Sequence, residues 1–158
     1  MPTFRTSRRV HHSASDMFDL VADVERYPSF VPLCQSLKVR KRSELDEGRE
    51  QLLAEMQIGY KAIRETFTSR VTLDRPNLKI LVEYVDGPFR QMENRWSFEE
   101  AAGPPEAPAS TIEFYIAYEF RSRMFGMLMG SVFDQAFRRF AEAFEQRANQ
   151  VYRRPSRA

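Results

Sequence analysis

Two hydrophobic periodicities divide the chain between them. From residue 49 to residue 120, apolar and polar residues alternate in successive segments, namely 49–59, 63–73, 78–85, 90–98 and 111–120. A period of two, with charged residues on the opposite face, predicts an antiparallel sheet that buries one face. The side chains expected on the buried face include Met56, Ile58, Phe67, Val82, Met92, Asn94, Trp96, Phe114, Ile116 and Tyr118.

Two further segments are candidate strands. Residues 3–10 are polar and rich in arginine, which favours the edge of a sheet, and residues 35–42 precede the polar turn 43–48. The expected sheet therefore has about seven strands. Asp86-Gly87-Pro88 is typical of a turn, and segment 99–110, with its prolines, is expected to be a long, mobile hairpin connection.

Helical spacing replaces the alternation over residues 122–152. One broad apolar stripe recurs there at about 100° per residue, and Ser122 is placed to cap the first turn. The stripe consists of Phe125, Met129, Val132, Phe133, Ala136, Phe137, Phe140 and Phe144. Gly126 and Gly130 flank it, and their missing side chains either allow close packing on the sheet or leave room for a ligand. A helix with such a stripe needs a wide apolar surface beneath it.

A shorter helix is predicted near the N-terminus, over residues 16–24. Its apolar residues recur at helical spacing, and Ser13 or Ser15 is placed to cap it. Pro28 and Pro32 prevent a long helix from following. Residues 27–34 are therefore expected to form a compact, aromatic-rich segment.

The order of these elements predicts an α+β helix-grip fold. A curved antiparallel sheet would wrap around the long C-terminal helix, with two short helices after the first strand. Because a strongly curved sheet holds a straight helix away from its floor, we expect an apolar cavity between them. The alternative is a dry core in which the aromatic rings close the gap. Residues 1–152 are expected to form one domain and residues 153–158 a frayed tail.

Charge argues against a DNA-binding protein. The formal net charge is only +2 over 158 residues, whereas a nucleic-acid footprint usually needs a denser basic field. Basic residues do cluster locally at 5–9, 38–42 and 147–157, which leaves open an attraction to lipid headgroups or RNA. The single cysteine and the lack of a signal-like or membrane-spanning apolar run favour a cytoplasmic protein.

Catalytic chemistry is sparse in this sequence. His11 and His12 are adjacent on an expected strand and point to opposite faces, so they cannot share a metal ion. Cys34 has no obvious histidine partner and is expected to be a buried structural thiol. On the inner face, only Glu65 with a tyrosine offers an acid/base pair. We therefore expect no enzyme and no catalytic cofactor or metal.

Four segments carry a family resemblance. They are Tyr27-Pro28-Ser29-Phe30-Val31-Pro32-Leu33-Cys34, Asp86-Gly87-Pro88-Phe89, Asn94-Arg95-Trp96-Ser97-Phe98, and residues 114–120 before the Met- and Phe-rich final helix. Together they resemble the coenzyme Q-binding branch of the START-like, polyketide cyclase/dehydrase-like domains, over about residues 3–152. That branch also includes the ribosome-association toxin.

The resemblance implies a helix-grip fold whose hydrophobic tunnel holds ubiquinone without transforming it. The expected lining comprises the inward residues of the sheet named above together with Phe30, Val31, Met129, Phe133 and Phe137. Asn94 and Tyr118 are the groups expected to meet the quinone oxygens.

The resemblance also implies partners. A quinone carrier would touch the inner membrane peripherally, with Met127 and Leu128 beside the Phe30–Val31 segment as a candidate mouth, and would serve respiratory or quinone-biosynthesis enzymes. The alternative is a ribosome-binding module that interferes with subunit association through the basic residues at 38–42. A cyclase-like enzyme is a third reading, and it would depend on Glu65.

Overall fold

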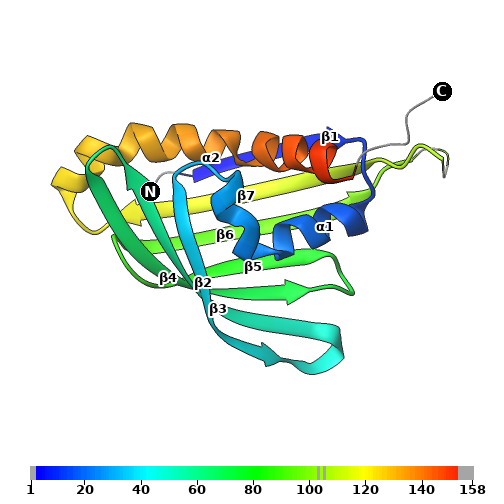
Figure 1. The fold of residues 1–158 in the computed structure, drawn as a ribbon, viewed down its shortest axis with the longest axis horizontal. Coiled ribbons are helices and arrows are strands. Elements are labelled where there is room, and N and C mark those ends of the chain that lie inside the picture. Colours follow the sequence, from blue (N-terminus) through cyan, green and yellow to red (C-terminus); the bar gives the residue numbers. More distant parts are fainter. Residues whose placement is uncertain (1–2, 103, 105, 153–158) are drawn as a thin grey trace.

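One antiparallel sheet organises the chain. In the computed structural model, which describes residues 3–102, 104 and 106–152, this sheet has seven strands in the order β1-β7-β6-β5-β4-β3-β2 (Figure 1). The strands are β1 (Thr3–Val10), β2 (Cys34–Glu44), β3 (Arg49–Tyr60), β4 (Ile63–Asp74), β5 (Lys79–Asp86), β6 (Phe89–Glu100) and β7 (Ser110–Phe120). The predicted fold class and strand positions are confirmed, and the arginine-rich β1 lies at an edge of the sheet as expected. The predicted tail 153–158, like Gly103 and Pro105 of the predicted mobile loop, lies outside the described residues.

The alternation predicted from the sequence is realised as rows of side chains across the sheet. Leu52 pairs with Val71, Val71 with Val82, Val82 with Asn94, and Asn94 with Ile116. Because side chains alternate along each strand, such a row lies on one face. The opposite face carries the charged residues and is exposed. The sheet thus offers one apolar floor.

Two short helices cover part of that floor. α1 (Ala14–Ala22) begins after Ser13, whose Oγ accepts a hydrogen bond from the Asp16 amide, and η1 (Val24–Ser29) is a 3-10 helix that contains Pro28. The helix starts and ends two residues earlier than the apolar spacing predicts, because Ser13 rather than Ser15 caps it. The buried side chains of α1 include Met17, Phe18 and Val21. A second 3-10 turn, η2 (Asp46–Gly48), joins β2 to β3.

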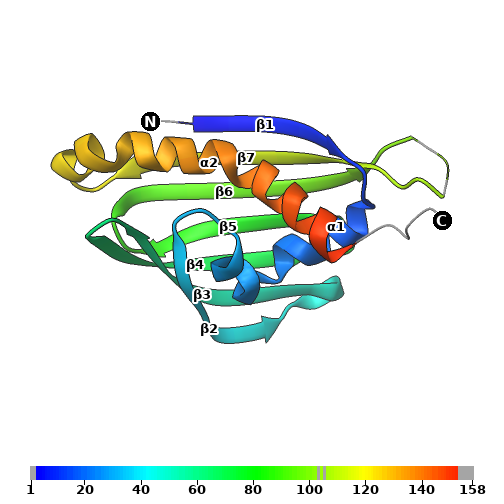
Figure 2. The ribbon, with the colours of Figure 1, turned by 45° about the horizontal axis from the view of Figure 1, so that its top comes forward.

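The long helix α2 (Arg123–Val151) lies along the β1–β7 side of the sheet (Figures 1 and 2). Ser122 caps it by accepting a hydrogen bond from the Phe125 amide. Near its C-terminal end, Arg8 of β1 forms an ion pair with Glu145, and His12 Nε2 donates to Asn149 Oδ1 over 2.7 Å. The helix is therefore held to the β1–β7 side of the floor. α1 packs beside it over β5–β7, and η1 packs on β2 at the far edge of the sheet.

The two glycines of α2 have different surroundings. A Cβ on Gly126 would lie 3.3 Å from the ring of Phe120, whereas a Cβ on Gly130 would meet nothing within 4 Å. Close packing therefore explains Gly126, but it does not explain Gly130. None of the described helices is long and apolar enough to cross a bilayer.

Candidate functional site

An apolar cavity separates α2 from the middle of the sheet. Its volume is about 90 Å³, and its walls come from the six strands β2–β7, from η1 and the following loop, and from α2. It is lined by Val24, Tyr27, Val31, Pro32, Leu33, Leu37, Ala54, Met56, Ile58, Phe67, Ser69, Val71, Ile80, Val82, Phe89, Met92, Asn94, Trp96, Ile116, Phe133, Ala136, Phe137, Phe140 and Phe144. The long helix is therefore held off its floor, but by a narrow gap.

Most of the residues that the sequence places in a tunnel do line this cavity. They are Val31, Met56, Ile58, Phe67, Val82, Met92, Asn94, Trp96, Ile116, Phe133 and Phe137. Their presence in the wall is a matter of geometry, and their contact with a ligand remains a prediction.

Four of the expected residues lie elsewhere. Phe30 packs edge-on against the wall residue Phe144, with ring centroids 5.0 Å apart, and does not itself line the cavity. Phe114 is fully buried behind Trp96 at 4.7 Å. Tyr118 is enclosed by Phe137 and other rings, and Met129 lines a smaller, separate hollow.

The sequence missed several wall residues. Tyr27, Pro32 and Leu33 belong to the proline-bracketed segment, which the resemblance had singled out through Phe30 and Val31 alone. Leu33 has a left-handed backbone (φ 68°), and its carbonyl accepts a hydrogen bond from the Gly59 amide at 3.0 Å. Three further wall residues, Ala136, Phe140 and Phe144, were also missed. The sequence did carry a signal for these three, because they belong to the same apolar stripe of the helix as the predicted Phe133 and Phe137.

Polar groups in the wall are few and mostly engaged. Asn94 Oδ1 accepts a hydrogen bond from Trp96 Nε1 at 3.0 Å, while Asn94 Nδ2 donates to the Tyr115 carbonyl at 2.9 Å. The Tyr27 hydroxyl donates to the Val21 carbonyl at 2.5 Å, and burial raises the pKa of Tyr27 far above its usual value. Ser69 is buried. Its hydroxyl and the second N–H of Asn94 are the donors left for a ligand in this wall.

Aromatic rings close one end of the cavity. Phe144 meets Trp96 at 5.0 Å and Tyr27 at 5.3 Å, in both cases edge-to-face. Such pairs add about 0.5–1.5 kcal/mol each beyond the buried area. This end of the cavity, near η1, is therefore closed by tightly packed rings.

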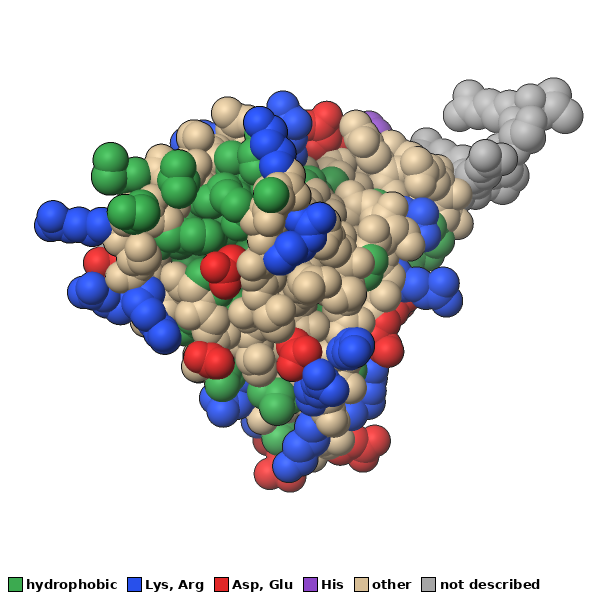
Figure 3. Space-filling view, turned by 60° about the vertical axis from the view of Figure 1, so that its left-hand side comes forward, with side chains coloured by type: hydrophobic (Ala, Val, Ile, Leu, Met, Phe, Trp, Pro, Cys, Tyr) green, Lys and Arg blue, Asp and Glu red, His purple; other side chains and the backbone are tan. Residues whose placement is uncertain are grey.

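The opposite end leads towards the surface. A second hollow beneath the first turns of α2 is lined by Leu33, Ile58, Gly59, Tyr60, Ile63, Glu65, Phe125, Met129 and Phe133. It shares Leu33, Ile58 and Phe133 with the main cavity, so the two are neighbours across these side chains. Figure 3 views this end of the molecule, where hydrophobic side chains gather around a hollow between cationic ones.

The cavity is smaller than a ring-shaped ligand requires. A benzene-sized ring occupies a cavity of about 150 Å³, whereas this one measures about 90 Å³. A bound quinone ring therefore needs its walls to move apart. The phenylalanines of α2 and the side chains of Met56 and Met92 are the movable parts, because methionine adapts to irregular spaces.

Acid–base and metal chemistry is scarce at this site. Among the described residues, no group of His, Cys, Asp and Glu could hold a metal ion. Cys34 lies buried near the cavity, and burial raises its pKa to about 11, so the reactive thiolate is disfavoured. Glu65 lies in the second hollow and not in the main cavity.

A helix-grip sheet around an apolar cavity defines the START-like class of small lipid-binding domains. A START superfamily protein from Mycobacterium smegmatis shares this fold. The TM-score is 0.75 over 94% of this chain and 98% of that one, with 19% of residues identical. Residues 10–145 match the model of the family described as polyketide cyclase/dehydrase and lipid transport, and the chain belongs to that family.

The chain is similar in sequence to two kinds of named protein. The ribosome association toxin RatA of Escherichia coli K12 is 33% identical over 152 residues, which cover 96% of this chain and 90% of the toxin. The coenzyme Q-binding protein COQ10 homolog B of Xenopus laevis is 29% identical over 153 residues, which cover 96% of this chain and 59% of that protein.

Proposed function

We propose that this protein binds a polyprenyl quinone, ubiquinone in the first instance, between the sheet and α2, and carries it without chemical change. The observation that carries the proposal is the cavity itself, whose wall is apolar except for a few hydroxyl and amide groups. The similarity to a coenzyme Q-binding protein supports the identity of the ligand. The scarcity of acid–base groups in the wall supports a carrier in preference to an enzyme.

The two donors left in the wall suit a quinone ring. The carbonyl and methoxy oxygens of ubiquinone only accept hydrogen bonds, and Ser69 Oγ and Asn94 Nδ2 each have a proton to donate. Tyr118 is a poor candidate for this role because it is absent from the wall. Burial, and next the charge of Asp134, raise the pKa of its hydroxyl.

Affinity for the tail should be modest. Burial of a CH₂ group from water contributes about 0.8 kcal/mol, but a polyprenyl tail that starts in a bilayer is already out of water. Transfer of the tail into the cavity therefore gains little, and exchange is easy. This behaviour suits a carrier that takes quinone from the inner membrane by peripheral contact and presents it to respiratory or quinone-biosynthesis enzymes.

The direct test is to purify the protein from a quinone-producing bacterium and to analyse the extracted lipids by mass spectrometry. We expect ubiquinone at a fixed ratio to protein, and transfer of ubiquinone from vesicles to the purified protein. If neither copurification nor uptake occurs at any protein concentration, the carrier proposal is wrong.

A second candidate function is a contact with the ribosome, favoured by the likeness to RatA toxins across nearly the whole chain. The basic cluster on β2 is a poor surface for it, because Arg40 is paired with Glu55 and Arg42 with Glu50 and Glu25. The outer face of the sheet carries a second group of cations.

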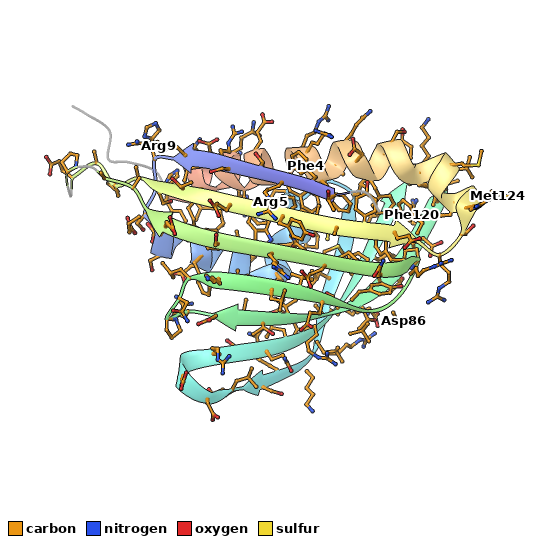
Figure 4. All side chains as sticks on the ribbon, turned by 180° about the vertical axis from the view of Figure 1, so that it is seen from behind. Phe4, Arg5, Arg9, Asp86, Phe120 and Met124 are labelled. Carbon is orange, nitrogen blue, oxygen red and sulfur yellow. The ribbon has the colours of Figure 1, made fainter. Side chains whose placement is uncertain are left out.

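A shallow depression crosses that outer face. There the guanidinium groups of Arg5 and Arg95 lie 4.8 and 5.7 Å from the centroid of the Tyr115 ring, and Arg5 is labelled in Figure 4, which views the sheet from behind. Arg49 and Lys79 add positive charge to its lining, whereas Asp74 and Glu113 reduce it. Arg95 also forms an ion pair with Glu93, so Arg5 is the arginine of this pair that has no ion pair with a carboxylate among the described residues. Paired cations around an aromatic ring suit RNA phosphates and bases.

Cosedimentation with ribosomal subunits separates this candidate from the first. Arg5→Gln with Arg95→Gln should weaken a salt-sensitive association, while Arg40→Gln with Arg42→Gln, which removes the same formal charge from β2, should not. Absence of cosedimentation at low salt would remove the candidate and leave quinone binding untouched.

A further inference from the structure

The first turns of α2 expose large apolar side chains. Met124, Met127 and Leu128 are 72%, 87% and 64% exposed, and we name these three residues the apolar tip. Figure 4 shows Met124 projecting from the end of the helix beyond Phe120. Single exposed apolar residues are ordinary, but several adjacent ones on one surface mark an interaction site.

The apolar tip continues into the mouth of the cavity. Phe125 and Met129, from the same two turns, line the second hollow together with Tyr60 and Ile63 of the β3–β4 turn. Phe125 also packs against Phe120 at 5.4 Å. One end of α2 thus presents side chains outward to the surroundings and inward to the route that leads to the main cavity.

Positive charge borders the apolar tip. Arg121 and Arg123 are exposed on either side of the helix cap and form no ion pair with any described residue. In the neighbouring turn, Arg64 Nη1 donates to the carbonyls of Lys61 and Ile63 at 2.5 and 3.0 Å. Lys61 lies 5.3 Å from the Tyr60 ring. Figure 3 shows cationic and hydrophobic side chains gathered on this end of the molecule.

Acidic groups are present at this end but are fewer. Glu65 lines the second hollow. Burial raises the pKa of Tyr84, and the charges of Asp86 and Glu65 add to this rise while that of Arg121 opposes it, so all three charges lie near this hydroxyl. Glu119 is engaged by Gln91 Nε2 at 3.1 Å. The basic groups named at this end therefore outnumber the acidic groups by four to three. Arg121 and Arg123 are the basic residues that directly precede the apolar tip in the sequence.

We infer that the apolar tip is a docking surface for an anionic lipid bilayer, into which Met124, Met127 and Leu128 insert while Arg121 and Arg123 contact headgroup phosphates. A second copy of the chain fits this surface less well. A symmetric contact would bring the arginines of both copies together, whereas phosphates offer the opposite charge. Apolar insertion combined with cationic contacts is how amphipathic surfaces bind membranes.

The role that we give this surface rests on the proposed quinone binding, since docking would set the cavity mouth against the membrane that supplies the ligand. The docking itself does not depend on quinone binding. The experiment therefore measures both properties separately, by flotation with quinone-free vesicles and by binding of a short-tail ubiquinone in the absence of vesicles.

The flotation uses vesicles of phosphatidylcholine alone and of phosphatidylcholine mixed with phosphatidylglycerol. We expect the protein to bind the anionic vesicles more tightly, and added salt to weaken the binding. The variant Met124→Ser, Met127→Ser, Leu128→Ser should bind about tenfold more weakly or worse, since each apolar side chain loses its burial. Arg121→Gln with Arg123→Gln should lose about fivefold per arginine on anionic vesicles only.

Controls on other surfaces exclude a general effect of lower hydrophobicity. Leu45 and Val151 are 37% and 49% exposed at other places in the fold, and Leu45→Ser with Val151→Ser should leave flotation unchanged. Because all the substituted residues are exposed, the variants should unfold at the temperature of the unmodified protein.

The outcomes separate the two proposals. If the unmodified protein floats, the apolar-tip variant does not, and both bind short-tail ubiquinone, docking and quinone binding both stand. If the two float alike, or the unmodified protein does not float yet binds the quinone, the docking surface is wrong and quinone binding survives. If flotation depends on the apolar tip but no quinone binds, docking stands alone. A dimer in solution that the apolar-tip substitutions dissociate would overturn docking in favour of a second copy.

Discussion

The indole Nε1 of Trp96 donates a hydrogen bond of 3.0 Å to Oδ1 of Asn94, two residues earlier on the same face of β6. The amide of Asn94 also donates to the Tyr115 carbonyl on β7, at 2.9 Å. One side chain thus satisfies a buried indole and joins two strands, and it keeps one N–H for a ligand. Asn94 therefore combines a structural role with the ligand contact that we propose for it.

Replacing Asn94 should reveal this double role. In Asn94→Leu the Trp96 N–H loses its partner, which costs about 1–3 kcal/mol of unfolding free energy, and a wall donor disappears. Urea unfolding measures the first effect and quinone titration the second. The double variant Asn94→Leu, Trp96→Phe has no unpaired indole N–H. The losses of unfolding free energy in the two single variants should therefore sum to more than the loss in the double variant. Simple additivity would show that the hydrogen bond does not stabilise the protein.

Filling the cavity should block the ligand. Ala136 lies in the wall on α2, and Ala136→Phe would occupy much of the gap, at a cost of about 1–3 kcal/mol from overpacking. We expect quinone uptake to fall severalfold while the fold persists. Gln135→Phe, on the exposed side of the same helix, is the matched control and should bind normally. Equal uptake by the two variants would place the ligand elsewhere.

Opening the packed end should enlarge the cavity. Phe144 is nearly inaccessible to solvent and holds Trp96 and Tyr27 in edge-to-face contacts. Phe144→Ala should cost about 3–5 kcal/mol. The variant should also bind benzene or xenon, which a cavity of ~150 Å³ accepts. Thermal unfolding with and without benzene tests this prediction, and a variant that benzene does not stabilise would show that the walls collapse into the space.

The buried thiol should give a signature at high pH. Burial raises the pKa of Cys34 in the folded state to about 11, above the ordinary value of about 8.5. The folded state binds the proton more tightly, so this contribution to stability is complete below the ordinary value and is lost as pH rises through the folded pKa. Cys34→Ala should therefore lose less stability than the unmodified protein between about pH 9 and pH 11.

Reaction with iodoacetamide checks the same burial. At about pH 8 the folded protein should react far more slowly than the unfolded protein, because little thiolate is present. Equal rates would show that Cys34 is accessible and ionised.

The positions of the strands along the chain were predictable because alternation is a local property. Phe67 and Val71 of β4 and Val82 of β5 share a face by the period of two alone, and the structure pairs Val71 with Val82. The helix stripe and the caps Ser13 and Ser122 were predictable for the same reason, since each depends on neighbours in sequence. These local rules explain why the fold was correctly predicted.

The exact wall of the cavity depends on where α2 lies across the sheet, and no local rule gives that position. Contacts such as Arg8 with Glu145 hold the helix over the β1–β7 side. Phe114 and Tyr118 of β7 are therefore packed solid, while Ile116 between them lines the cavity. Leu33 was missed because its left-handed backbone turns the chain out of the regular pattern.

The most direct measurement is an NMR titration of the labelled protein with a short-tail ubiquinone. If the quinone enters between α2 and the sheet, the amide signals of Ser69, Asn94 and Ala136 should shift together and saturate at one equivalent, while those of Arg5 and Tyr115 on the outer face should stay in place. Shifts confined to the outer face, or none at saturating quinone, would contradict the account.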